Sequence, residues 1–306
     1  MKTRLKQLIT LLAYGFISLF LYSFLKNIDT SVIAKADMNF VYIIPATLAA
    51  LGSRLLAPLV WICLLKHFDD FEVRYNELYA VYAKSWMFRY IPGKIALIGT
   101  KIVWSVQYGV SKTSAIIASF LENVLNVFGS ALLSVVFFPF FYSSNQIDSQ
   151  LLLGTLFAVF LMILALVPPV FNRLTSLAFS VIKKEKIDRP INLTFRVLSR
   201  ATSIVFIAKF VSGLATAFIT LSVKGNITLA DFCALVGIAA LSGAVGMAAF
   251  FAPGGLGVTD SVQIVLIASI VGKELALVVV MTWRLITVIC DLLFYFLVGR
   301  SGQVGS

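Results

Sequence analysis

The sequence predicts an all-α polytopic membrane protein, and three observations lead to that prediction. Of the 306 residues, 60% are hydrophobic and the mean hydropathy is +0.97, which is more apolar surface than a soluble domain of this length can bury. The apolar residues form runs of helical length and lack the short alternation that is typical of an outer-membrane barrel. Lys and Arg gather in segments between those runs, as they do in cytoplasmic loops.

The apolar runs predict about six full spans within a single transmembrane domain, residues 1–306. The predicted spans are residues 8–25, 40–65, 113–140, 150–171, 201–222 and 276–298. The first span resembles a signal peptide, but the A-x-A-like sequence at Ala34–Ala36 lies too far beyond the apolar run. We therefore expect the first span to be retained.

The distribution of basic residues predicts the orientation. The loop 172–200 is rich in Lys and Arg and is expected to be cytoplasmic, whereas residues 141–149 contain neither and are expected outside. The N-terminal MKTRLK sequence and Arg300 place both termini inside. This topology explains most of the net charge of +11, so we expect no nucleic-acid partner.

The segment 77–108 does not fit a full span. Both of its ends are expected inside, so it must cross the membrane an even number of times. Its limbs, 77–91 and 95–108, have about 15 residues each and reach about 22 Å, short of a hydrocarbon core of about 30 Å. The sequence therefore predicts a re-entrant helical hairpin that breaks at Pro92-Gly93.

The segment 229–272 predicts a second hairpin, which enters from the outside. Its break is Pro253-Gly254-Gly255; the limb before the break is long enough to span, and the limb after it, 257–271, is not. Each half of the chain, residues 40–140 and residues 201–298, is then predicted to contain a span, a hairpin and a second span. The halves have opposite orientation, which indicates inverted repeats with a central binding site.

Ionisable residues at membrane depth are costly and are therefore candidate site residues. Glu122 and Asn126 share one helix face, and so do Arg284 and Asp291. Because the spans that carry them follow the two hairpins, we expect an ion pair between Glu122 and Arg284. The alternative to a site role is a purely structural pair that clamps the repeats.

The first hairpin contains basic residues near its break. Arg89 and Lys94 flank Pro92-Gly93, and Lys101 lies on the second limb. One interpretation is that they extend toward the cytoplasmic face. The other is a phosphate clamp, in which Lys and Arg combine with the free N–H groups at a helix N-terminus.

The second hairpin contains a glycine-rich break followed by a carboxylate. Gly254, Gly255 and Gly257 allow the backbone to approach a ligand closely. Thr259 or Asp260 could cap the helix that follows, and capping is the role we expect for Asp260. The alternatives are that Asp260 contacts the substrate, titrates, or binds a coupling cation.

These motifs resemble those of the lysylphosphatidylglycerol synthase membrane-domain family, which includes the flippase half of the multiple peptide resistance factor. The similar stretches are RYIPGKIALIGTK, ASFLENVLNVFG, FFAPGGLGVTD and TWRLITVICDLLFY. The resemblance covers residues 5–300. Family members often have Arg-Glu where this chain has Thr259-Asp260. No synthase domain follows, so aminoacyl transfer is not expected.

The resemblance implies a flippase-like protein of a prokaryotic cytoplasmic membrane. Its partner would be a membrane phospholipid or lipid-linked substrate, whether anionic, aminoacylated or glycosylated. Two alternatives remain: an ion- or proton-coupled transporter of small solutes, and a non-catalytic membrane partner of a lipid glycosyltransferase. No metalloprotease, P-loop or Ser/His/Asp motif is present, and the cysteines and His67 have no metal-ligand spacing. We therefore expect neither enzyme activity, nor a metal, nor a cofactor.

Overall fold

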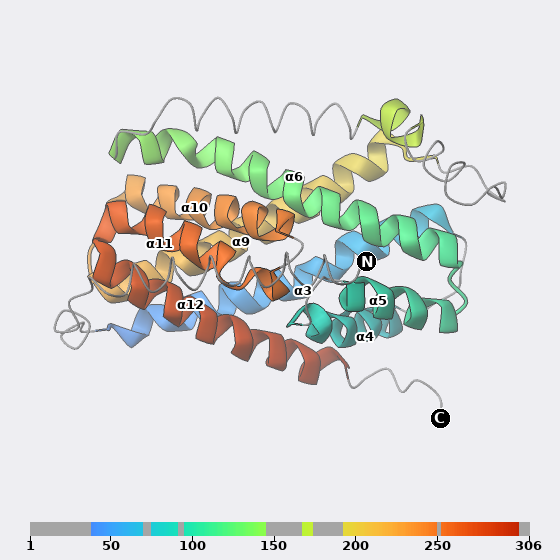
Figure 1. Cartoon of the computed structure of the whole chain (residues 1–306), viewed down its shortest axis with the longest axis horizontal. Coiled ribbons are helices and arrows are strands. Elements are labelled where there is room, and N and C mark those ends of the chain that lie inside the picture. The colour runs from blue at the N-terminus through green and yellow to red at the C-terminus, as the bar shows by residue number, and fades with distance from the viewer. Residues whose placement is uncertain are drawn as a thin grey trace, which may run out of the picture.

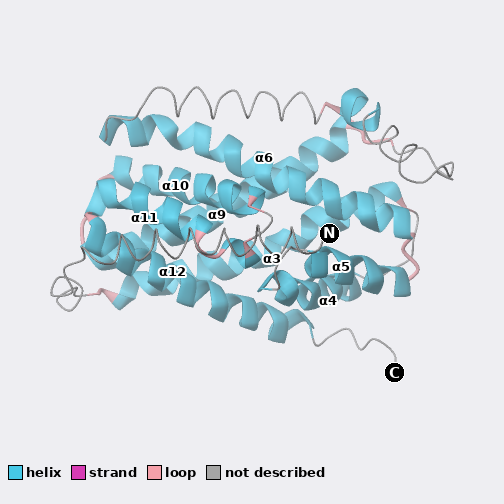
Figure 2. Ribbon diagram, in the orientation of Figure 1, coloured by secondary structure: helices cyan, strands magenta, loops and turns pink. Residues whose placement is uncertain are grey.

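The computed structural model describes residues 38–69, 75–90, 95–144, 167–173, 192–249 and 252–299. Within those ranges all regular secondary structure is helical (Figure 2). The predicted span 8–25, most of the predicted span 150–171 and most of the basic loop 172–200 lie outside the described residues. Both termini and the predicted break at Pro92-Gly93 lie outside them as well.

The described helices fall into two groups along the chain (Figure 1). The first group is η1 (Phe40–Tyr42), α3 (Ile43–Phe68), α4 (Tyr75–Trp86), η2 (Met87–Tyr90), α5 (Ile95–Gln107) and α6 (Lys112–Ser144). The second group is α9 (Phe195–Lys224), α10 (Leu229–Ala248), η3 (Pro253–Gly255), α11 (Val258–Val271), α12 (Lys273–Phe294) and the π-helical turn η4 (Tyr295–Gly299).

The lengths and composition of these helices identify a multi-pass membrane protein. Helices long and apolar enough to cross a membrane are Phe40–Phe68, Lys112–Phe137, Phe195–Lys224, Leu229–Ala248 and Lys273–Gly299. They include the predicted spans 40–65, 201–222 and 276–298, and they cover residues 113–137 of the predicted span 113–140. The boundaries differ from the prediction: α9 begins at Phe195, inside the predicted loop 172–200, and α6 continues to Ser144, inside the predicted loop 141–149.

Among the described helices, α4, α5 and α11 are too short to cross a membrane. Helices α4, α5 and α11 have 12, 13 and 14 residues. At ~1.5 Å per residue they reach about 18 to 21 Å, against about 30 Å of hydrocarbon. Helix α10, with 20 residues, is long enough. These lengths agree with those predicted for the limbs of the two hairpins.

The two pairs of limbs extend from opposite ends of the bundle. The Asn39 N–H donates to the Ser222 carbonyl (2.9 Å), so α3 begins where α9 ends. The Ser111 N–H donates to Oδ2 of Asp69 (2.7 Å), so α3 ends where α6 begins. Since α4 follows α3 and α10 follows α9, α4 and α5 occupy one end of the bundle and α10 and α11 the other (Figure 1).

The helix contacts of the two halves correspond to each other. Helix α3 packs against α9, α6 packs against α10, and α4 packs against η4 at the end of α12. Helix α5 packs on α6 as α11 packs on α12. Exchanging α3–α6 for α9–α12 therefore reproduces most of these contacts, except that α4 packs on η4 where α10 packs on α6 itself.

Buried hydrophobic side chains form one cluster toward each end of α3. The cluster at its C-terminal end includes Trp61, Tyr82 and Leu121. The cluster at its N-terminal end includes Ala50 and Val280. Because α3 and α9 contribute to both clusters, these two packed helices connect the ends of the bundle.

Close packing between α9 and α10 makes Gly213→Ala destabilising. A Cβ atom at Gly213 would lie 2.7 Å from Cγ1 of Val236 and 3.1 Å from that residue's Cα and carbonyl oxygen. The backbone of α10 cannot yield without moving the helix, so we expect a loss of about 1–3 kcal/mol. The measurement is the midpoint of thermal unfolding in detergent.

Gly52→Ala is the matched control. Its Cβ would meet only Cγ1 of Val211, at an ordinary 3.8 Å. Alanine also favours a helix over glycine by about 1 kcal/mol. We therefore expect an unchanged or higher midpoint, and equal losses in the two variants would contradict the packing argument.

Candidate functional site

Polar residues recur at helical spacing on the two spans that follow the hairpins. On α6 they are Glu122, Asn126 and Ser130, and on α12 they are Arg284, Thr287 and Asp291. Spacings of three and four residues place each set on one face of its helix. The carboxylates and the guanidinium of these two faces are held by residues from neighbouring helices.

Asp291 joins three segments of the chain. Its Oδ1 accepts hydrogen bonds from Nε of Arg54 (2.7 Å) and from Nε1 of Trp86 (3.0 Å), and its Oδ2 lies 3.3 Å from Nη1 of Arg89. The carboxylate side chain is 1% exposed. The indole of Trp86 also faces both guanidinium groups, at 4.5 Å from Arg89 and 5.9 Å from Arg54. Two cations thus share one buried carboxylate.

Glu122 forms a second buried cluster, on α6. Its Oε2 accepts from Nζ of Lys101 on α5 (2.5 Å), and its Oε1 accepts from the Tyr82 hydroxyl on α4 (2.7 Å). The side chains of Lys101 and Glu122 are only 3% and 4% exposed. Both oxygens of the carboxylate therefore have a partner from the first hairpin.

Arg284 and Asp260 form a third, bidentate pair. Nε of Arg284 donates to Oδ1 of Asp260 (2.5 Å) and Nη2 donates to Oδ2 (2.8 Å). Oδ2 of Asp260 also accepts from the Gly257 N–H (2.9 Å), at the N-terminus of α11. The prediction that Asp260 caps this helix is confirmed, and the same carboxylate neutralises Arg284.

The predicted pair between Glu122 and Arg284 was wrong. Each charge instead pairs with the second limb of the hairpin that precedes its own span: Glu122 with Lys101, and Arg284 with Asp260. The reason is that α5 packs on α6 and α11 packs on α12. A neighbour along the chain is therefore closer to each charge than the equivalent span of the other half.

Segments η2 and η3 meet near these pairs. Nη2 of Arg89, in η2, lies 3.5 Å from the carbonyl oxygen of Gly254, in η3. Nη2 of Arg284 lies 3.4 Å from the carbonyl oxygen of Gly255. Gly254, Gly255 and Gly257 have φ angles of 58°, 74° and 80°, a region that residues with a Cβ rarely adopt. The glycines allow the turn that presents these carbonyls.

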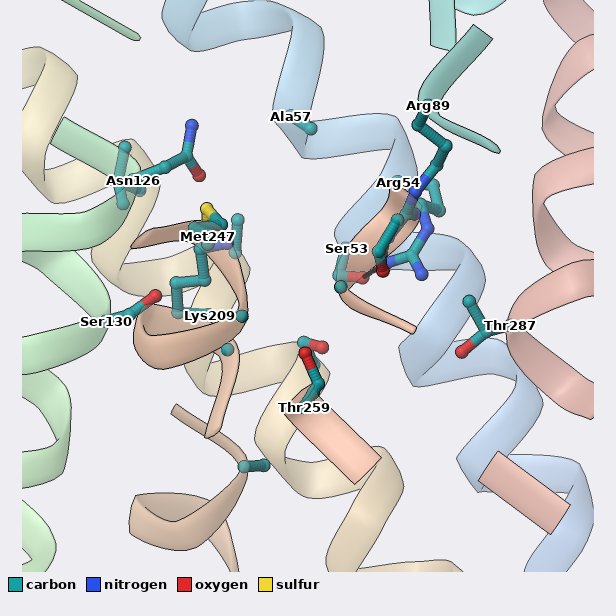
Figure 3. A pocket seen from close by; sticks show the side chains of 18 of the residues that line it. Ser53, Arg54, Ala57, Arg89, Asn126, Ser130, Lys209, Met247, Thr259 and Thr287 are labelled. Atoms are coloured by element: carbon teal, nitrogen blue, oxygen red, sulfur yellow. Dashed lines mark hydrogen bonds between the residues drawn. The ribbon is translucent and has the colours of Figure 1, made fainter. Parts of the chain in front are cut away.

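A cavity of about 200 Å³ lies among these groups. Its basic lining residues come from different helices: Arg54, Arg89, Lys101, Lys209 and Arg284. Among the described residues that line it, Glu122 is the one carboxylate. Figure 3 shows Arg54 and Arg89 together on one side, and Asn126, Ser130 and Lys209 on the other. The charged groups that line the cavity are thus predominantly basic.

The predicted site residues differ in their position relative to the cavity. Those that line it are Arg89, Lys101, Glu122, Asn126, Gly254, Gly255 and Arg284. Asp260 and Asp291 hold the lining guanidinium groups. Pro253 begins η3 and Gly257 precedes α11. Pro92, Gly93 and Lys94 lie outside the described residues.

Sequence reasoning missed or left open several residues of the site. Arg54 and Lys209 were recognisable as charged residues inside apolar spans. The sequence did not indicate whether their side chains face a cavity, and the structure shows that both line it. Tyr82 and Trp86 are four residues apart on α4, and this spacing could have indicated that their polar groups lie on one face of the helix. Within the described ranges, no group of three His, Cys, Asp or Glu side chains is placed to hold a metal ion.

Comparison with models of known protein families gives a match that covers most of the chain. The sequence profile described as "Lysylphosphatidylglycerol synthase TM region" matches residues 9–294. A search of curated proteins gives no match to this chain. The profile match extends over both halves of the described structure, including all the residues that line the cavity.

Proposed function

Because this chain belongs to the lysylphosphatidylglycerol synthase TM region family, we propose that it is a flippase-like protein that moves a polar lipid across the membrane. The observation that carries the proposal is the cavity lined by basic residues where η2 and η3 meet. The headgroup would occupy this cavity while the acyl chains stay in the surrounding lipid.

The chemistry of the cavity is suited to a lipid phosphate. Guanidinium groups donate forked hydrogen bonds to phosphate oxygens, and ammonium groups act as point charges. Two opposite unit charges 4 Å apart attract by about 4 kcal/mol at an effective dielectric constant of about 20. Arg54 and Arg89 both contact the Asp291 carboxylate, so two guanidinium groups lie together on this side of the cavity, where they could meet an anion.

The arrangement of the helices supports alternating access. The corresponding contacts of α3–α6 and α9–α12 are those expected of inverted repeats, and the hairpins extend from opposite ends as re-entrant segments would. In the proposed mechanism, rocking of the two halves opens the cavity alternately to each side. The proposed setting is a prokaryotic cytoplasmic membrane with both termini inside.

Arg284→Gln tests this proposal in liposomes that contain the purified protein. We expect the wild-type protein to move acyl-labelled lipids between leaflets, and the variant to do so at least tenfold more slowly, because a lost charged hydrogen bond costs about 1.5–3 kcal/mol. Chemical quenching of outer-leaflet fluorescence measures the rate. Equal rates would remove Arg284 from the mechanism.

The control is Arg196→Gln, which removes an exposed guanidinium at the start of α9. We expect this variant to retain the wild-type rate. If the wild-type protein moves none of an anionic, a zwitterionic and a cationic lipid faster than protein-free liposomes, the proposed function is wrong.

A further inference from the structure

Buried polar groups without partners distinguish among the headgroups that the cavity could accept. Ser130 Oγ, Gln263 Oε1 and Thr287 Oγ1 have no hydrogen-bond partner, and all three residues line the cavity. They come from α6, α11 and α12 and are at most 4% exposed. Native structures rarely leave buried polar groups unpaired. These groups are therefore suited to a ligand that itself offers hydroxyl groups.

Asn126 adds a further acceptor beside Ser130. Its Nδ2 donates to the carbonyl oxygen of Glu122 (2.9 Å), which leaves Oδ1 as an acceptor for a ligand. Figure 3 places Asn126 and Ser130 on the side of the cavity opposite Arg54 and Arg89. A single headgroup can thus place a phosphate on the guanidinium side and hydroxyl groups on the amide side.

The carboxylates of the site are already committed to other groups. Asp291 holds two guanidinium groups, Glu122 holds Lys101 and the Tyr82 hydroxyl, and Asp260 holds Arg284. An ammonium group on a ligand would have to displace one of these cations or lie among them. Among the described lining residues, the cavity therefore has charge complementarity for an anion and not for a cation.

We infer that the cavity selects a lipid whose headgroup combines an anionic phosphate with uncharged hydroxyl groups, and that it disfavours a headgroup that carries an ammonium group. This inference rests on the proposed function, because it assumes that a lipid headgroup enters the cavity. It narrows the substrate class from polar lipids in general to phosphate esters of a polyol.

Three lipids with identical acyl chains test the inference. Phosphatidylglycerol has a phosphate and hydroxyl groups, phosphatidylmethanol has the same charge without hydroxyl groups, and lysyl-phosphatidylglycerol carries additional ammonium groups. Native mass spectrometry measures how much of each the purified protein retains from an equimolar mixture. We expect phosphatidylglycerol to exceed phosphatidylmethanol by about 3- to 10-fold, the value of one or two hydrogen bonds. We expect it to exceed the lysyl lipid by at least tenfold.

Ser130→Ala and Ser134→Ala form a matched pair for the hydroxyl part of the inference. Ser134 lies one turn further along α6, and its hydroxyl donates to the Ala131 carbonyl (2.7 Å). Ser130→Ala is expected to bring the ratio of phosphatidylglycerol to phosphatidylmethanol toward one. Ser134→Ala is expected to keep the wild-type ratio.

The outcomes separate this inference from the proposed function. Equal retention of the lysyl lipid and phosphatidylglycerol overturns the charge selection, and equal retention of phosphatidylglycerol and phosphatidylmethanol overturns the hydroxyl contact. In both cases, lipid binding in the cavity is still supported if the Arg284→Gln variant retains less lipid than the wild-type protein. If no lipid is retained in an Arg284-dependent way, the proposed function fails and the inference fails with it.

Discussion

Replacing Lys101 by methionine is expected to lower the free energy of unfolding by about 3–5 kcal/mol, the usual cost of breaking a buried ion pair. The variant leaves Glu122 buried, with the Tyr82 hydroxyl as its remaining partner among the contacts described above. The loss follows from an uncompensated charge in a medium of low dielectric constant. Denaturant unfolding of the purified protein in detergent measures it.

The double variant Lys101→Met/Glu122→Gln shows whether the cost is electrostatic. Removing both charges should restore most of the stability, because a neutral pair avoids the uncompensated carboxylate. Lys112→Met, at an exposed position at the start of α6, should change stability by less than about 0.5 kcal/mol. If the double variant is as unstable as the sum of the single variants, the buried charge is not the cause.

Replacing Asp291 by asparagine is expected to slow lipid movement at least tenfold and to destabilise the fold by about 3 kcal/mol, because two guanidinium groups lose their shared counter-charge. Asparagine keeps the shape of aspartate, but one of its atoms becomes an amide donor. The single oxygen of the amide can accept hydrogen bonds from Arg54 and Trp86, or it can accept from Arg89. It cannot accept from both sides, so the amide N–H groups face at least one donor.

Adding Arg54→Gln to Asp291→Asn tests this explanation. The second change removes one of the two cations, so we expect it to recover part of the lost stability. Asp231→Asn is the control: Asp231 takes part in the capping box of α10, and its loss should cost no more than about 1 kcal/mol. A further fall in stability on adding Arg54→Gln would contradict the shared-carboxylate argument.

The fold class was predictable because the bilayer imposes a length and a composition on the helices that cross it. The same physics identified α4, α5 and α11 as too short to span, and placed a break at Pro253. The positions of the helix ends were predicted less accurately. The basic start of α9, from Phe195 to Arg200, is helical, because charge indicates the side of the membrane but not where a helix begins.

The ion pairs of the site were harder to predict than its charged residues. Spacing along one helix places Arg284 and Asp291 on a common face, but partners depend on which helices pack together. Lys101 and Asp260 were recognised as site residues, whereas their pairing with Glu122 and Arg284 requires the contacts of α5 with α6 and of α11 with α12. Ser130 continues the helical spacing of Glu122 and Asn126, whereas a single amide residue such as Gln263 carries no distinguishing sequence signal.

The two ion pairs between a hairpin and the span that follows it have opposite polarity. The first hairpin contributes the cation, Lys101, and the second contributes the anion, Asp260. If either hairpin docked against the span of the other half, Lys101 would meet Arg284, or Asp260 would meet Glu122. Such like-charge contacts are strongly unfavourable at membrane depth. The polarity therefore specifies which hairpin docks on which span while the chain assembles, and disfavours exchange of hairpins between halves or between copies.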